Sequence, residues 1–182
     1  MSLTSTQAFV HVGSWDENTR SHPATKWLEH YTCDYVDTQK FKTESAASTE
    51  HAKDWVLQKS TGEVVEDAEA AWKAVAEIYS PFSSFVHEPR FIVIWQTEKG
   101  WDLWGAASIW YNLAAPPSGG EQKVKGHGGK EWDGSTPGAF YFKTIQDGDD
   151  FKLVRTEIYS DPSKAMVQML KRGMLKPEQL MG

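Results

Sequence analysis

One histidine, one aspartate and three tyrosines are the residues of this sequence that best suit acid and base chemistry. Such chemistry needs a group that titrates near neutral pH, or one moved there by burial, and a donor that holds developing negative charge. His87 begins the aromatic segment HEPRFIVIW and is the candidate acid or base. Asp34 lies between Tyr31 and Tyr35, where burial would raise the pKa of its carboxyl group. Tyr31, Tyr35 and Tyr111 are candidate hydrogen-bond donors to a substrate oxyanion.

Each of these candidates also has a purely structural interpretation. His87 would then be a histidine that fixes the start of a strand, and Asp34 an exposed helical aspartate. Arg155 and Glu157 share a strand face with apolar neighbours. They form either an ion pair inside a pocket or, as we favour, a solvated pair on the outer face of a sheet.

Motifs for other kinds of chemistry are absent from the sequence. The six histidines show neither HxH nor HExxH spacing, and Cys33 has no CxxC partner, so we expect no bound metal. There is no GxSxG motif, and the segment around His127 does not lead from a strand into a helix, so no phosphate cradle is predicted. The remaining chemistry needs no cofactor.

The composition limits the class of protein. A chain of 182 residues with 40% hydrophobic and 24% charged residues is typical of one soluble domain. A net charge of −6 argues against nucleic acid or an anionic membrane as a partner. A single cysteine suits a reducing compartment, and no apolar run is long enough to span a membrane. We therefore expect a cytoplasmic protein.

Residues 87–113 contain four of the nine tryptophans and have the pattern of a β-hairpin. Successive side chains of a strand point to opposite faces, and both faces of this hairpin are apolar. On the first arm Phe91, Val93 and Trp95 share one face, and Ile92 and Ile94 share the other. Either the hairpin is a central strand pair, or its second face meets a helix, a ligand or another subunit.

The other elements follow from periodicity and from Gly and Pro positions. Helices are predicted after Ser21, over about 48–58 and over 66–79, then the hairpin, strands over 139–145 and 151–159, and a last helix after Asp161 that ends at Gly173. Residues 1–20 form an arm, 21–173 a single domain and 174–182 a tail, and the Gly- and Lys-rich loop 116–138 has no assigned role. This order predicts an α+β fold with a curved antiparallel sheet around N-terminal helices.

Three features of the sequence together resemble the nuclear transport factor 2-like, or SnoaL-like, cone fold over roughly residues 20–172. They are the stripe of Trp27, Tyr31 and Tyr35, the HEPRF entry into the hairpin and the closing KLVRTEIYSD strand. Uncharacterised fungal members of that superfamily look most similar in style. The resemblance implies a cone-shaped half-barrel with an apolar pocket, often a homodimer through the outer sheet face. Its relatives include ketosteroid isomerase, scytalone dehydratase, limonene epoxide hydrolase and polyketide cyclases. The acid and base sets of the first two have no recognisable version in this sequence.

Two hypotheses follow. The protein is a cofactor-free lyase or isomerase of the dehydratase or cyclase type, which acts on a hydrophobic, polycyclic or polyketide-like metabolite through His87, Asp34 and Tyr31. Alternatively, it binds an apolar ligand or a protein without catalysis. In an enzyme these groups should converge on one cavity of drug size, lined by Trp27, Tyr31, Trp72 and a hairpin tryptophan. The full set of predicted substrate-binding residues is Trp27, Tyr35, Trp55, Trp72, Trp95, Trp104, Tyr111 and Phe140.

Overall fold

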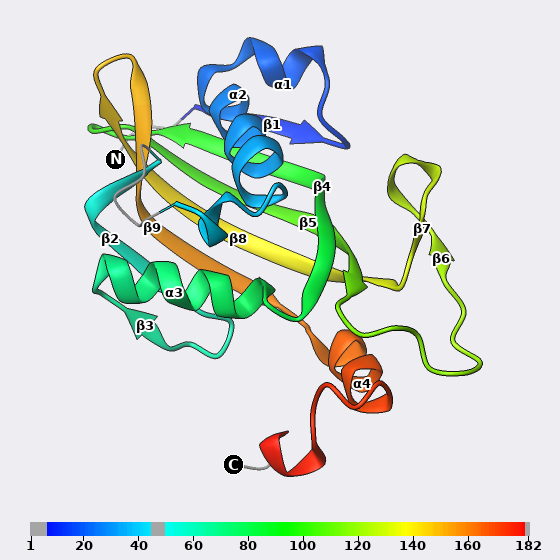
Figure 1. Cartoon of the computed structure of the whole chain (residues 1–182). Coiled ribbons are helices and arrows are strands. Elements are labelled where there is room, and N and C mark those ends of the chain that lie inside the picture. Colours follow the sequence, from blue (N-terminus) through cyan, green and yellow to red (C-terminus); the bar gives the residue numbers. More distant parts are fainter. Residues whose placement is uncertain (1–6, 45–49, 181–182) are drawn as a thin grey trace, which may run out of the picture.

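The computed structural model of the protein describes residues 7–44 and 50–180 and contains a large curved sheet that does not close (Figure 1). Its seven strands lie in the order β1 (Ala8–Val12), β4 (Phe82–Gln96), β5 (Trp101–Leu113), β8 (Gly134–Asp147), β9 (Asp150–Ser160), β2 (His51–Gln58) and β3 (Val64–Val65). Neighbouring strands are antiparallel except β2 and β9, which run parallel. The short strands β6 (Val124–Lys125) and β7 (Glu131–Trp132) pair with each other in the connection between β5 and β8.

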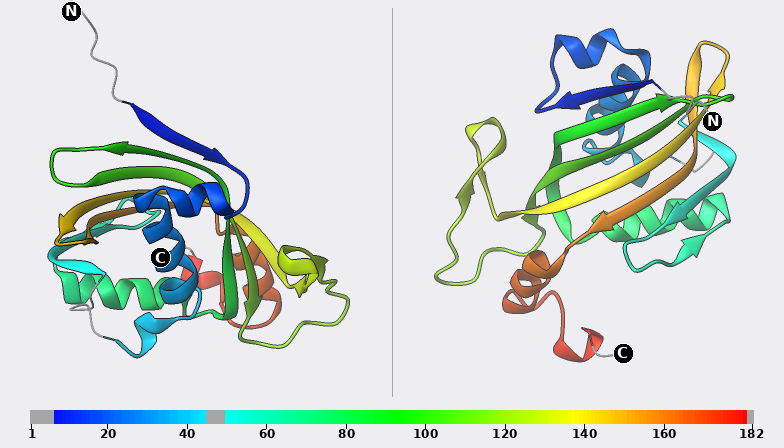
Figure 2. Two further views of the ribbon diagram at one scale, coloured as in Figure 1. Left: turned by 90° about the horizontal axis from the view of Figure 1, so that it is seen from above. Right: turned by 180° about the vertical axis from the view of Figure 1, so that it is seen from behind.

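The helices lie mainly on the concave side of the sheet. They are α1 (Glu17–Ser21), α2 (Pro23–His30), a π-helix (Tyr31–Val36), α3 (Ala68–Tyr79) and α4 (Ser163–Lys171), with short 3-10 turns at Lys40–Lys42, His127–Gly129 and Pro177–Leu180. Seen from above, the sheet curves around α2 and α3, and from behind both helices lie beyond the strands (Figure 2). The concave face therefore meets helices, while the convex face is turned away from them. None of the described helices is long and apolar enough to cross a membrane.

Bulges let the long strands bend. The pairing of β4 with β5 shifts its register between Pro89 and Phe91, and that of β8 with β9 shifts between Lys143 and Thr144. A proline has no N–H for the ladder, so its place in a central strand is at such an irregularity. Each bulge increases the local twist and bends the strand. The curvature makes room for the helices and for the residues between them and the sheet.

Several sequence predictions are confirmed. The first predicted helix begins at Pro23, and α3 begins at Ala68, where the carboxylate of Asp67 accepts a hydrogen bond from the backbone N–H of Ala70. The hairpin and both later strands are present, and the two faces of β4 alternate as predicted. Ile92 and Ile94 are fully buried in the core, whereas Phe91 on the other face is exposed. These features depend on local periodicity, which the sequence shows directly.

Two predictions about the first 60 residues are wrong. The helix expected over about 48–58 is strand β2, although residues 48 and 49 lie outside the described residues. Trp55 and Leu57 are buried at a spacing of two, and the indole N–H of Trp55 donates to the hydroxyl of Thr156 on β9. The arm 1–20 contributes β1, which pairs with β4, so the helices do not precede all the strands.

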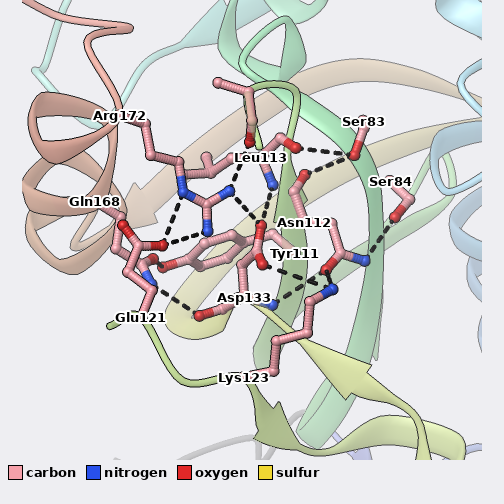
Figure 3. Close-up of polar contacts among 11 residues, drawn as sticks. Ser83, Ser84, Tyr111, Asn112, Leu113, Glu121, Lys123, Asp133, Gln168 and Arg172 are labelled. Carbon is pink, nitrogen blue, oxygen red and sulfur yellow. Dashed lines mark hydrogen bonds and ion pairs between the residues drawn. The ribbon is translucent and has the colours of Figure 1, made fainter. Parts of the chain in front are cut away.

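A buried ion-pair network fixes α4 against the end of the sheet (Figure 3). The guanidinium of Arg172, whose side chain is 1% exposed, donates to Glu121 Oε2 at 2.6 and 2.9 Å and to Asp133 Oδ2 at 2.8 Å. The same Asp133 oxygen accepts the backbone N–H of Leu113 at 2.9 Å. The hydrogen bond from Arg172 lowers the pKa of Glu121. Burial by itself would raise the pKa of Asp133, but the bonds from Arg172 and Leu113 lower it overall.

We expect Arg172→Met to lower the free energy of unfolding at pH 7 by about 3 kcal/mol, because it leaves a carboxylate buried without its cation. The loss should shrink in acid. The folded-state pKa values of Glu121 and Asp133 are lowered, so the network stabilises fully above their ordinary values of about 4 and its contribution is lost as the pH falls through the folded values. Urea unfolding at pH 7 and pH 3 measures both effects. Arg20→Met, which removes an exposed pair with Glu29, is the control and should cost much less, because solvent screens an exposed ion pair. Equal losses for the two variants would contradict this account.

Candidate active site

The strongest arrangement for acid and base chemistry is a hydrogen-bonded pair between Asp37 and His87. The carboxylate oxygen Oδ1 of Asp37 lies 2.6 Å from Nδ1 of His87, and the side chains are 9% and 15% exposed. The backbone N–H of His87 also donates to the same carboxylate, at 3.1 Å to Oδ2. Asp37 follows the π-helix, and His87 is on the central strand β4. The pair thus joins the helical layer to the sheet.

The partners of His87 determine which nitrogen carries the proton. An ionised carboxylate only accepts hydrogen bonds, so Nδ1 of His87 must donate to Asp37. In the neutral imidazole Nε2 then has a free lone pair. The hydroxyl of Tyr79 lies 3.0 Å from Nε2 and donates to it. Burial and the charge of Asp37 raise the pKa of Tyr79 above its ordinary value, so Tyr79 is protonated at neutral pH.

His87 and Tyr79 line a cavity of about 90 Å³ between the helices and the concave face of the sheet. Its walls are apolar and include Val36, Trp55, Val75, Ile109, Phe140 and Ile158, and small residues at Ala107, Gly138 and Ala139 leave the space open. Among the described residues the lining contains no Lys, Arg, Asp or Glu. The polar groups of the lining residues are the two phenols, the imidazole of His87, two threonine hydroxyls and the indole N–H groups of Trp15 and Trp55. Charge that develops there would be poorly solvated by water, so neighbouring dipoles act strongly on it.

A second pair of phenol and imidazole lies beside the same cavity, and only its phenol lines it. The hydroxyl of Tyr31, a lining residue, is 3.2 Å from Nε2 of His51. Burial lowers the pKa of His51 to about 3, so this imidazole is neutral at physiological pH. Burial also raises the pKa of Tyr31 well above its ordinary value. The two phenols of the cavity therefore have different partners: Tyr79 contacts an imidazole that is paired with a carboxylate, and Tyr31 contacts one that stays neutral.

The structure brings four predicted site residues to the cavity and leaves the others elsewhere. His87, Tyr31, Trp55 and Phe140 line it. Three predicted rings are buried in the core beside Tyr31 and His51 but do not border the cavity: Trp27, Tyr35 and Trp72. Tyr111 is buried at the end of the sheet, where its hydroxyl donates to Gln168. Trp95 and Trp104 are on the convex face, because they alternate with Ile94 and Leu103, which are fully buried.

Of the lining predicted for a cavity of drug size only Tyr31 is present, because Trp27 and Trp72 do not border the cavity, and the predicted size is wrong. No hairpin tryptophan of the described chain lines it, and Trp15, which lies between β1 and α1, does so instead. Pockets that bind drug-sized ligands have volumes of about 300 to 1,000 Å³, several times the volume found. The aromatic side chains expected to surround a ligand fill much of the cone themselves.

The prediction of a buried catalytic carboxylate at Asp34 is also wrong. Its side chain is 64% exposed and pairs with Nδ1 of His30 at 3.0 Å. The helix changes to π geometry at Tyr31, with the backbone N–H of Asp37 donating to the carbonyl of Thr32 five residues earlier. A π-turn contains more residues than an α-turn, so it rotates Asp34 away from the stripe that α-helical periodicity predicts. Asp37 comes to the histidine in its place.

The remaining candidates lie outside the cavity. Arg155 and Glu157 form an ion pair, with Arg155 Nε 2.5 Å from Glu157 Oε1, and point to the convex face as the favoured interpretation expected. His127, in the Gly- and Lys-rich loop, pairs with Glu88 at 3.2 Å. Within the described residues no group of three or more His, Cys, Asp or Glu could hold a metal ion.

Known structures share this architecture. A scytalone dehydratase-like protein from Novosphingobium aromaticivorans superposes with a TM-score of 0.57 and 13% identity, over 80% of this chain and 89% of that one. The hexachlorocyclohexane dehydrochlorinase LinA-type3 from Novosphingobium barchaimii gives 0.54 and 11%, over 80% and 91%. A SnoaL-like protein from Jannaschia gives 0.51 and 11%, over 79% and 88%. The chain has the nuclear transport factor 2-like cone fold.

The cone fold is what these likenesses establish, since identities of 11 to 13% do not carry an activity from one protein to another. Similar structures of this fold include dehydratase-like, dehydrochlorinase and cyclase-like proteins. No protein-family model matches the sequence, and a search of curated proteins finds no match. The expectation of a cone fold is confirmed, and the chemistry must be inferred from the cavity.

The neutral state of His51 predicts how stability depends on pH. In the unfolded chain this histidine titrates near pH 6.5, and in the folded protein near pH 3. The unfolded state therefore binds more protons between these pH values. As the pH falls through this range, His51 should lower the free energy of unfolding by about 1.4 kcal/mol per pH unit. His51→Gln should reduce the slope by this amount in urea unfolding measured from pH 7 to pH 4; His22, whose pKa burial also lowers, contributes the same sign. His30→Gln, at a half-exposed site, is the control and should leave the slope unchanged. An unchanged slope in His51→Gln would show that the buried histidine does not contribute to it.

Proposed function

We propose that the protein is a cofactor-free lyase or isomerase in which His87, oriented by Asp37, removes a proton from a carbon atom of a small substrate. The observation that carries this proposal is the bond between Asp37 and His87 beside an apolar cavity. A carboxylate on Nδ1 fixes the tautomer that has its lone pair on Nε2 and stabilises the imidazolium that forms. The fold relatives with dehydratase and dehydrochlorinase names are consistent with proton abstraction of this kind.

Tyr31 supplies the hydrogen bond to the substrate oxygen that gains negative charge. His51 is neutral, and in the tautomer with its proton on Nε2 it donates to the oxygen of Tyr31. The proton of Tyr31 is then free for a carbonyl oxygen in the cavity. Such a donor in a water-poor site acts on the transition state more strongly than on the ground state.

The substrate that fits this cavity is compact, uncharged and largely apolar. The described lining offers no ionised side chain to pair with a carboxylate or phosphate, and burial of an unpaired charge is costly. A cavity of about 150 Å³ holds benzene, so at about 90 Å³ a molecule of similar size enters only with a small outward movement of the lining, and the polycyclic substrate expected from the sequence would need a much larger one. We therefore take a small neutral ketone or alcohol as the model substrate.

The convergence of groups supports an enzyme over a passive ligand-binding protein. An apolar ligand needs only the aromatic lining. Here His87, Tyr31 and Tyr79 border one cavity, and Asp37 supports the histidine from behind. A buried histidine paired with a carboxylate adds nothing to the binding of an apolar molecule, whereas proton transfer requires it.

His87→Gln should slow the elimination of water from β-hydroxyethyl methyl ketone by about 10²- to 10⁴-fold, because glutamine keeps the polarity but cannot accept the proton. Asp37→Asn should have a smaller effect in the same direction, since the amide no longer stabilises the imidazolium. The product, methyl vinyl ketone, is measured by its absorbance. His30→Gln is the control at an exposed histidine. A wild-type rate equal to that of buffer, or an unchanged rate in His87→Gln, would count against catalysis and in favour of a ligand-binding role.

We also infer that the protein forms a homodimer through the convex face. Large apolar side chains on this face are exposed on neighbouring strands: Val10 (58%), Val12 (76%), Phe91 (36%), Trp104 (37%) and Tyr159 (41%). Such a contiguous apolar surface is typical of an interface. The pair of Arg155 and Glu157 on the same face provides both signs of charge, which suits a second copy of the same surface.

Trp104→Glu should convert the dimer to a monomer in sedimentation equilibrium at micromolar concentration, because it places a charge in the middle of the apolar surface. Val167→Glu is the matched control. Val167 is 50% exposed on α4, away from the convex face, and this variant should remain dimeric. A monomeric wild type under these conditions would exclude the proposed interface.

A further inference from the structure

Tyr79 lines the cavity, but the proposed role of His87 as general base gives it no function. Its hydroxyl lies 3.0 Å from Nε2 of His87 and occupies the lone pair that must accept the substrate proton. Both residues line the cavity. We propose that Tyr79 is the acid of the same reaction. In the empty site its hydroxyl donates a hydrogen bond to His87, and when substrate binds it donates to the leaving oxygen instead. This assignment rests on the proposed role of His87.

The ring of Tyr79 is fixed, so only its hydroxyl can rotate. It is the last residue of α3, and its ring stacks on Phe85 with centroids 4.4 Å apart and packs against Phe41 at 5.5 Å. Moving the ring off His87 would break these contacts in a packed core. Rotation about the C–O bond moves only a hydrogen atom and leaves the oxygen beside the imidazole. The lone pair of Nε2 thus loses its hydrogen bond without a rearrangement of the chain, and the substrate C–H approaches it beside the phenol oxygen.

The hydroxyl of Tyr79 turns away from His87 only for certain substrates. A buried donor needs an acceptor, so the proton of Tyr79 leaves Nε2 only when another acceptor comes within reach. An oxygen on the carbon next to the acidic C–H would be that acceptor. The site therefore favours molecules with a hydroxyl group β to a carbonyl, where the carbonyl oxygen takes the bond from Tyr31 and the hydroxyl takes the bond from Tyr79.

The protons and electrons of such an elimination balance within the site. Nε2 of His87 takes the proton of the α-carbon, and the C–H electron pair becomes the new C=C bond. The C–O bond breaks, its electron pair leaves with oxygen, and Tyr79 gives that oxygen its proton, so that water forms. The imidazolium of His87 then returns a proton to the phenolate of Tyr79 across their 3.0 Å contact. The substrate loses water, and both residues recover their resting states without an external acid or base.

The raised pKa of Tyr79 favours the step of this cycle in which the phenolate takes its proton back. Burial and the nearby charge of Asp37 disfavour the phenolate, so after donating its proton the residue strongly favours taking one back. Tyr31 has no comparable source of protons, because its partner His51 is neutral and burial keeps it so. The two phenols of the cavity therefore have different roles: Tyr31 stabilises charge and Tyr79 transfers a proton.

Two substrates that give the same product distinguish the role of the acid from the role of the base. β-Hydroxyethyl methyl ketone loses water and needs a proton on its leaving group, whereas β-chloroethyl methyl ketone loses chloride and needs none. Tyr79→Phe should slow loss of water by about 10²-fold or more, as expected for removal of a general acid. It should leave loss of chloride at the native rate or increase it, because Nε2 is no longer covered. A native rate with the chloride also shows that the variant is folded.

The other outcomes each decide a point. If Tyr79→Phe eliminates water at the native rate, Tyr79 is not the acid, and the role of His87 is unaffected. If it loses both reactions equally while its thermal unfolding midpoint is unchanged, Tyr79 relays or positions the base, and the assignment as acid of the leaving group is overturned. If His87→Gln retains both reactions, the proposed function itself fails. Tyr141→Phe, which removes a hydroxyl bonded to Asp102 on the convex side, is the matched control and should change neither rate.

Discussion

The contact between Asp37 and His87 is the constraint on which the rest of the cavity depends. It joins residues 50 positions apart, one at the end of the helical layer and one on a central strand. Because the carboxylate accepts both the ring N–H and the backbone N–H of His87, it fixes the position of the strand as well as the tautomer of the imidazole. The direction of the hydrogen bond from Tyr79 then follows, and so does the site at which a substrate proton would be accepted.

Two similar pairs of side chains have different surroundings. In each pair a phenol that lines the apolar cavity contacts an imidazole. His51 is deprived of water, and its pKa falls to about 3, so it stays neutral. His87 has an ionised carboxylate on its other nitrogen, which compensates a positive charge when the ring accepts a proton. An enzyme that moves protons needs groups with such different environments, and this cavity provides them on one scaffold.

The curved sheet separates two uses of aromatic residues. Strand alternation places the alternate side chains of β4 and β5 on opposite faces, so the hairpin contributes to the cavity and to the convex surface at once. The concave side is filled by rings from the helices, which explains the small volume of the cavity. The convex side leaves Trp104 and Tyr159 partly in water. Different side chains of the same strands thus pack the interior and form the exposed aromatic surface.

The sequence by itself determined the features that local periodicity encodes. It predicted the aromatic stripe and the two faces of the hairpin, and its resemblance to a known superfamily implied the cone fold. His87 was expected at the start of the hairpin but lies inside β4, which begins at Phe82. It did not predict that residues 51–58 form a strand, since that depends on pairing with β9, nearly 100 residues away. Nor did it identify Asp37 and Tyr79, because α-helical spacing pointed to Asp34 and a π-helical turn changed which carboxylate faces the sheet. Only the tertiary structure decided these points, because hydrogen bonds between distant residues leave no periodic signal in the chain.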